Sequence, residues 1–78
     1  MGQDIDAVVP TLTALLASKE KDARYVAADT LGKIGPAARV AIPALVEAID
    51  DPEFDVSQAA VEAIRTIDVE IAVQLGLL

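Results

Sequence analysis

The chain has 78 residues, a net charge of −7, and neither cysteine nor histidine. This length allows one small domain. The missing cysteines exclude disulfides and thiolate metal sites, and the missing histidines remove the commonest general base and transition-metal ligand. The charge is uneven, because residues 1–35 carry four basic and five acidic side chains, whereas residues 36–78 carry two and eight. Such an acidic surface repels phosphate backbones and anionic lipids, so we expect no nucleic-acid and no membrane partner.

The N-terminal residues contain no basic cluster ahead of an apolar run, and no apolar run is long enough to span a bilayer. We therefore expect a cytoplasmic protein. Apolar residues at helical spacing begin at Ile5 and predict a first helix over about 4–18, with Asp4 as its N-cap. Pro10 lies inside this pattern. Since proline lacks an N–H and clashes with the preceding turn, we expect a kink or a broken first turn there.

The same periodicity predicts a second helix over about 22–34, with Asp22 as its N-cap. The pair Gly35-Pro36 should end this helix, because glycine adopts the left-handed conformation that closes a helix and proline cannot continue it.

A third helix is predicted over about 37–50, with Pro43 as an internal kink. A fourth is predicted over about 55–67, where Asp55 and Gln58 have the spacing of a capping box. Asp68 is the candidate cap of a last short helix.

A shift of the sequence by 33 residues superposes two helical hairpins without a gap. Apolar, turn and cap positions all coincide; among them are Val9 on Ile42, Pro10 on Pro43, Leu12 on Leu45, Glu20 on Glu53, Asp22 on Asp55, and Leu31 on Ile64. We interpret residues 4–35 and 36–68 as two repeats of a single domain, 1–78. Residues 69–78 are then a short capping helix or a truncated third repeat. This segment either folds back on the second repeat or joins two copies as a homo-oligomer.

The repeats carry recognisable motifs. The second repeat has Ile42-Pro43-Ala44-Leu45 in its first helix and Asp51-Pro52 in its turn, and the second helix of the first repeat reads ARYVAADTLGKIG over residues 23–35. In these residues the chain resembles HEAT-repeat proteins, in particular the short bacterial HEAT-like repeats of the phycobilisome-lyase type. The resemblance implies an all-α fold, an α-solenoid of two antiparallel hairpins.

HEAT-like repeats often pair an Asp in the turn with an Arg early in the second helix. The chain departs from this pattern, because serine occupies two of the four positions in its two repeats. Ser18 stands where the Asp of the first repeat would be, and Ser57 where the Arg of the second would be. One such pair remains possible. The resemblance implies that Arg24 of the first repeat pairs with Asp51 or Asp50 of the second and so bridges the repeats.

No pattern of residues indicates catalysis. The carboxylates from Asp50 to Asp55 lack the spacing of a calcium loop and are better explained as turn and cap residues. Asp29 and Glu62 coincide in the repeat and could form an acid–base pair. However, each has a basic residue one turn on, as solvated helix pairs do. We expect no enzyme, no metal and no cofactor.

The resemblance also implies a binding surface, because the second helices of such stacks line the side that carries partner contacts. Tyr25 lies off the apolar stripe beside Arg24, and exposed Tyr next to Arg is enriched at interfaces; packing over the neighbouring loop is the other explanation. By position, the predicted partner-binding face consists of Tyr25, Asp29, Lys33, Gln58, Glu62 and Arg65.

Three hypotheses follow for function. The first is a non-enzymatic protein–protein interaction module, a minimal HEAT-repeat adaptor or regulatory protein. The second is an accessory subunit related to phycobilin lyases that acts in chromophore attachment. The third is an excised or designed fragment of a longer HEAT solenoid.

Overall fold

The computed structural model describes residues 5–78 and is helical, with no strand among these residues. The predicted cap Asp4 lies outside the described part. The elements in chain order are α1 (Ile5–Leu15), α2 (Lys21–Ile34), the 3₁₀ segment η1 (Gly35–Ala41), α3 (Ile42–Ala48), α4 (Phe54–Ile67) and α5 (Val69–Gln74).

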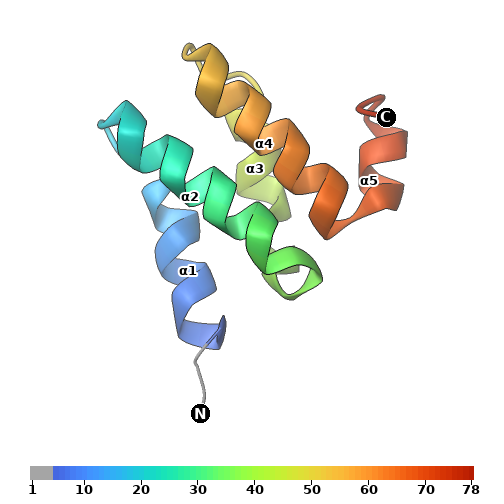
Figure 1. Cartoon of the computed structure of the whole chain (residues 1–78), viewed down its shortest axis with the longest axis horizontal. Helices are drawn as coiled ribbons and strands as arrows, with labels where there is room; N and C mark the ends of the chain where they lie inside the picture. Colours follow the sequence, from blue (N-terminus) through green and yellow to red (C-terminus); the bar gives the residue numbers. More distant parts are fainter. Residues whose placement is uncertain (1–4) are drawn as a thin grey trace.

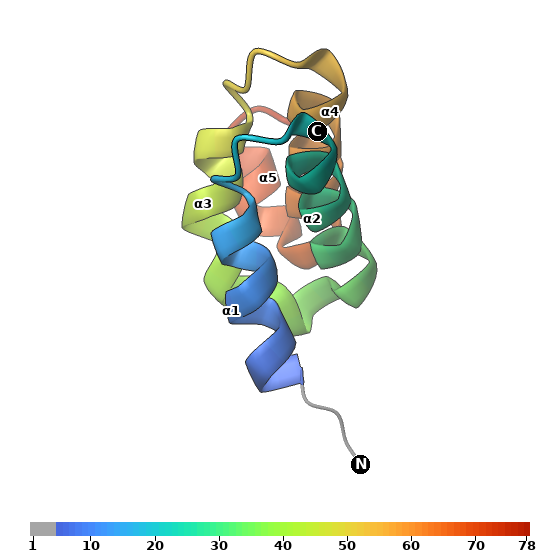
Figure 2. The same ribbon diagram turned by 90° about the vertical axis from the view of Figure 1, so that its left-hand side faces the viewer.

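Two helical hairpins stack side by side (Figure 1). The first consists of α1 and α2, and the second of α3 and α4. Figure 2 shows that α1 and α3 form one layer and α2 and α4 the other. The short helix α5 lies beyond α4, at the opposite end from α1 (Figure 1). The molecule is therefore an all-α, solenoid-like stack, as the repeat predicts, and it measures 36 × 29 × 16 Å.

The core is made of small and medium aliphatic side chains from both hairpins. The largest fully buried ones are Leu31, Leu45, Ile64 and Val56, and alanines fill the space between them. All four of these side chains lie at positions that the helical period assigns to the core. Neither aromatic residue belongs to the core, because Tyr25 is 42% exposed and Phe54 is 73% exposed.

The second helices approach each other closely at Gly32 of α2. A Cβ placed on Gly32 would lie 3.1 Å from the Cα of Ala63 in α4, which is tighter than ordinary packing. Ala28 and Ala63 are buried on the same facing surfaces. The small residues therefore set how near α2 and α4 can lie.

The two intra-repeat turns are built alike and correct the predicted caps. Helix α2 begins after Glu20 and α4 after Glu53, and neither of these residues makes a side-chain cap. Instead the side chain of Ser18 accepts a hydrogen bond from the Glu20 N–H at 3.0 Å, and that of Asp51 accepts one from the Glu53 N–H at 2.9 Å. Asp22 and Asp55, predicted as caps, lie inside the first turns.

The predicted third helix over 37–50 is wrong in its first half. Gly35 has φ 81° and ψ −148°, a conformation that essentially only glycine adopts, so the chain leaves α2 sharply. Residues Gly35–Ala41 then form a 3₁₀ segment, and α3 starts only at Ile42. Pro43 lies in the first turn of α3, where its missing N–H costs no hydrogen bond, so it begins a helix instead of kinking one.

The first helix also differs from expectation. Helix α1 runs through Pro10 without a break and ends at Leu15, short of the predicted end near 18. The hydroxyl of Thr13 donates to the Val9 carbonyl one turn back at 2.7 Å.

The C-terminal segment is attached to α4 through Asp68. As predicted, Asp68 caps α5: its carboxylate accepts hydrogen bonds from the Glu70 and Ile71 N–H groups at 3.1 and 3.2 Å. It also pairs with Arg39 of η1 at 3.0 Å. After α5, Gly76 at φ 76° closes the helix with a Leu77 N–H to Ala72 carbonyl bond of 2.8 Å.

Packing at the α2–α4 contact should make Gly32 intolerant of a branched side chain. We expect Gly32→Val to lower the free energy of unfolding by about 1–3 kcal/mol, because the helices must separate. Lys33→Val is the control on the exposed side of α2, since the Lys33 side chain is 77% exposed; it places the same branched side chain in the helix and removes only a surface ion pair with Asp29. Urea titration followed by circular dichroism measures both; a Gly32→Val protein as stable as the control would contradict the close contact.

The corrected caps give a second prediction. Asp68→Ala should lower stability by about 0.5–2 kcal/mol, because two N–H groups of α5 lose their acceptor. Asp55→Ala removes a first-turn carboxylate that caps nothing, and should cost less. Amide hydrogen exchange should also speed up in α5 for Asp68→Ala. Equal losses in the two variants would argue against the observed caps.

Candidate functional site

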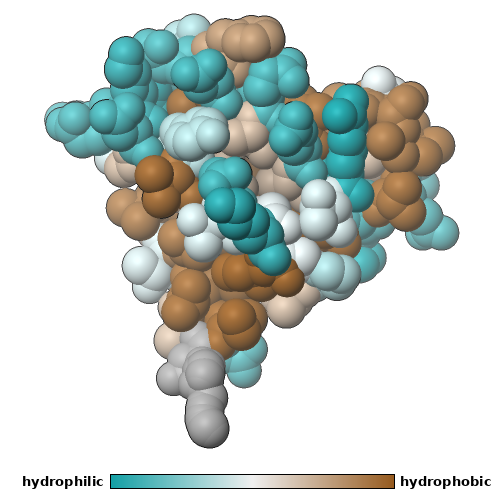
Figure 3. All heavy atoms as spheres, in the orientation of Figure 1, coloured by the Kyte–Doolittle hydropathy of each residue, from teal (hydrophilic) through white to brown (hydrophobic). Residues whose placement is uncertain are grey.

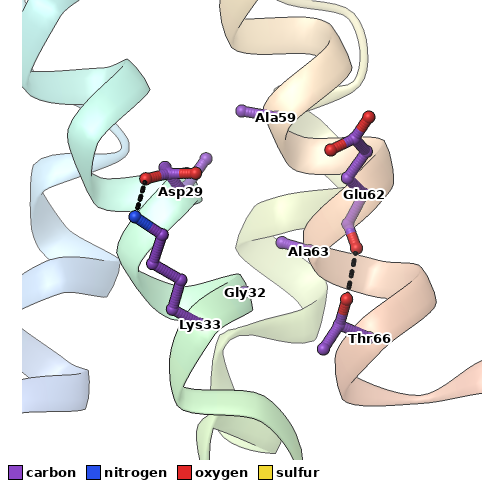
Figure 4. Close-up of a pocket in the computed structure, with 8 residues that line it drawn as sticks. Asp29, Gly32, Lys33, Ala59, Glu62, Ala63 and Thr66 are labelled. Carbon is purple, nitrogen blue, oxygen red and sulfur yellow. Dashed lines mark hydrogen bonds and ion pairs between the residues drawn. The ribbon is translucent and has the colours of Figure 1, made fainter.

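The surface formed by α2 and α4 is hollowed into a groove along the line where the helices meet. Figure 4 shows its lower part, with α2 on one side and α4 on the other. This part has a volume of about 360 Å³. Its lining consists of Ala28, Asp29, Gly32, Lys33, Ala59, Glu62, Ala63 and Thr66.

The groove exists because its floor is made of small residues and its walls of long ones. Ala59 and Ala63 point from α4 toward α2, opposite Gly32 (Figure 4). Asp29 and Lys33 rise along one wall and Glu62 along the other. The same small side chains that let the helices approach therefore leave a channel above them.

The groove continues toward the N-terminal ends of both helices, where Tyr25 joins its wall. This upper part has a volume of about 310 Å³. It is lined by Tyr25, Asp29, Asp55, Gln58, Ala59 and Glu62. Three carboxyl side chains and no basic side chain line it, so this lining carries a negative formal charge.

Five of the six residues of the predicted partner-binding face line the groove, and Arg65 does not. The Nε of Arg65 donates to the Leu77 carbonyl at 2.6 Å, so this side chain is turned toward the C-terminal segment and not toward Glu62. Lys33 pairs with Asp29 at 3.2 Å, the helix pair that their spacing predicts.

One acidic residue of the groove lining was not anticipated from the sequence. Asp55 lines the upper part because it is a first-turn residue and not a cap. Phe54, the first residue of α4, is 73% exposed but lines neither part of the groove.

Arg24 joins the two intra-repeat turns beside the groove. Its guanidinium makes two hydrogen bonds to Asp51, from Nε to Oδ2 at 2.7 Å and from Nη2 to Oδ1 at 3.2 Å. Nη1 donates to the carbonyls of Ser18 and Lys19 in its own turn at 2.9 and 3.2 Å. The side chains of Arg24 and Asp51 are 14% and 8% exposed, so this is a shielded contact between the hairpins.

Sequence comparison agrees with the stacked hairpins. A family model described as HEAT repeats matches residues 2–74. The chain belongs to the HEAT-repeat family. Comparison with curated proteins and with solved structures gave no match.

Membership in the HEAT family fits the observed surface, because HEAT repeats generally mediate protein–protein interaction and act as scaffolds. Within residues 5–78 no group of three or more potential ligands is placed to hold a metal ion. In the same part of the chain, every helix is too short or too polar to cross a membrane.

The hydrogen bond to Arg24 lowers the pKa of Asp51 against the opposing effect of burial. The bond from the Glu53 N–H and the charge of Arg24 act in the same direction. The same contact with Asp51 raises the pKa of Arg24. The pair is therefore ionised at neutral pH in this HEAT stack.

This depressed pKa predicts how stability depends on pH. Because the pKa of Asp51 is lower in the folded state than the ordinary Asp value of about 3.9, its ionised carboxylate stabilises the fold at pH values above about 3.9. This stabilisation is lost as the pH falls through the lower, folded-state pKa. We expect wild type to exceed Asp51→Asn in unfolding free energy at pH 7, and the difference to shrink as the solution is acidified below about pH 4. Urea titrations over this range measure it, with the exposed neighbour change Asp50→Asn as the control. A difference that is constant with pH would contradict the ionised pair.

Proposed function

We propose that the chain is a non-enzymatic interaction module, an adaptor or regulatory protein, that binds a protein partner in the groove between α2 and α4. The observation that carries this proposal is the groove itself, with Tyr25 42% exposed on its wall. A large, partly exposed aromatic side chain above a floor of alanine and glycine gives a partner both an apolar anchor and room to enter.

The acidic lining of the groove indicates which side chains a partner would present. Carboxylates of Asp29, Asp55 and Glu62 border the upper part, and Lys33 is already paired with Asp29. A partner segment that presents Lys or Arg beside an apolar residue would complement this surface. The remaining hypotheses from the sequence, phycobilin attachment and a fragment of a longer solenoid, have no observation that favours them.

The proposal predicts which substitutions weaken binding. In affinity capture from the source organism, wild type should retain a specific protein that Tyr25→Ala and Glu62→Lys retain about tenfold less, the loss expected for an interface anchor. Val40→Ser is the control, because Val40 lies on η1 outside the groove and is 73% exposed. Binding should also weaken as the salt concentration rises.

Two results would contradict the proposal. One is a partner that both groove variants retain and Val40→Ser loses. The other is a partner whose retention no groove substitution changes, in proteins whose circular dichroism shows the native helix content.

A further inference from the structure

The first hairpin has an apolar surface on the side that faces away from the second hairpin. We call it the outer face of the first hairpin, and it consists of Ile5, Val8, Leu15 and Val26, exposed by 40%, 42%, 39% and 54%. Figure 2 looks onto this end of the molecule, with α1 and α2 nearest the viewer. In Figure 3, hydrophobic surface gathers over α1 and the adjoining edge of α2.

The equivalent positions in the second hairpin indicate the structural role of this face. The 33-residue shift superposes its members on alanines of the second hairpin: Ile5 on Ala38, Val8 on Ala41, Leu15 on Ala48, and Val26 on Ala59. Ala38 and Ala41 are fully buried, Ala48 is 8% exposed, and Ala59 packs against the core. In the second hairpin these positions form the surface on which the first hairpin stacks. The outer face is therefore a stacking surface that no described residue covers.

The opposite end of the stack is different. Helix α5 covers α4 there, with Ala72 fully buried and Ile71 and Leu77 packed against the core. Its own outward side still exposes Val69 and Val73. Apolar exposure alone thus does not decide which end another molecule would cover.

The distribution of charge distinguishes the two ends of the stack as surfaces for contact between two copies. Residues 1–35 have a net charge of −1, whereas residues 36–78 have a net charge of −6. Contact between two first hairpins brings the nearly neutral halves together and keeps the acidic halves apart. Contact between two α5 ends would place the acidic halves side by side, where they repel.

We propose that a second copy of the chain covers the outer face of the first hairpin, in a closed dimer with two-fold symmetry. In such a dimer the same patch serves both copies, so association stops at two. The valines, leucine and isoleucine of this face remove more apolar area from water than the equivalent alanines would. The groove between α2 and α4 stays open in each copy, so this inference does not rest on the proposed function.

Analytical ultracentrifugation of the full chain tests the dimer. Wild type should sediment with twice the mass of the chain. Val8→Glu and Val26→Glu should weaken association at least about tenfold, because each buries a carboxylate in an apolar contact. Val73→Glu is the matched control on α5, where Val73 is 61% exposed, and should leave the dimer intact.

Three results would overturn the inference. They are a monomer at concentrations up to about 1 mM, a mass that keeps rising with concentration, and a dimer that Val73→Glu dissociates while Val8→Glu and Val26→Glu do not. The last would assign association to α5.

A second measurement does not depend on how the glutamate variants fold. Because the chain contains no cysteine, Val8→Cys and Val73→Cys each accept a single spin label. The distance between labels on two copies should be shorter for Val8→Cys than for Val73→Cys. The reverse order would overturn the proposed arrangement.

Discussion

The close contact between α2 and α4 is the constraint on which the rest of the structure depends. With Gly32 opposite Ala63, the two second helices lie near enough to bury Leu31 and Ile64 between the layers. A chain this short buries little surface, so it relies on close helix packing by small side chains for its stability. The groove is a consequence of that packing, since small residues that bring the backbones together leave space above them.

The contact fixes the distance between the hairpins, and Arg24 fixes their register. Its guanidinium holds Asp51 of the second turn while it donates to the Ser18 and Lys19 carbonyls of the first. Ser18 and Asp51 are equivalent in the repeat, and each accepts the N–H that starts the next helix. One arginine therefore connects two copies of the same turn, and in the second copy Ser57 occupies its place and bonds the Ile49 carbonyl instead.

The sequence predicts the hairpins, their order and the α5 cap at Asp68, because these depend on periodicities and on side chains that act locally. It fails where two local signals compete. Asp55 is a good N-cap residue, but the side chain of Asp51 already accepts the hydrogen bond from the Glu53 N–H that starts α4. Asp55 therefore lies inside the first turn of the helix and lines the groove. The unusual backbone of Gly35 and the proline that follows turn the predicted helix into a 3₁₀ segment. Contacts between distant elements, such as the ion pair of Arg39 with Asp68, are not predicted by local sequence patterns.

The two repeats differ in side-chain size at equivalent positions of their stacking surfaces. Where the second hairpin has Ala41 and Ala59, the first hairpin lies on top of it; where the first has Val8 and Val26, the side chains are larger and exposed. Side-chain size at equivalent positions thus separates the surface used inside the chain from the one available to another molecule. The acidic residues follow the same division, since they are concentrated in the second repeat and leave the first nearly neutral. An apolar, nearly neutral end and an acidic groove suit different kinds of contact, and the fold keeps them on different sides.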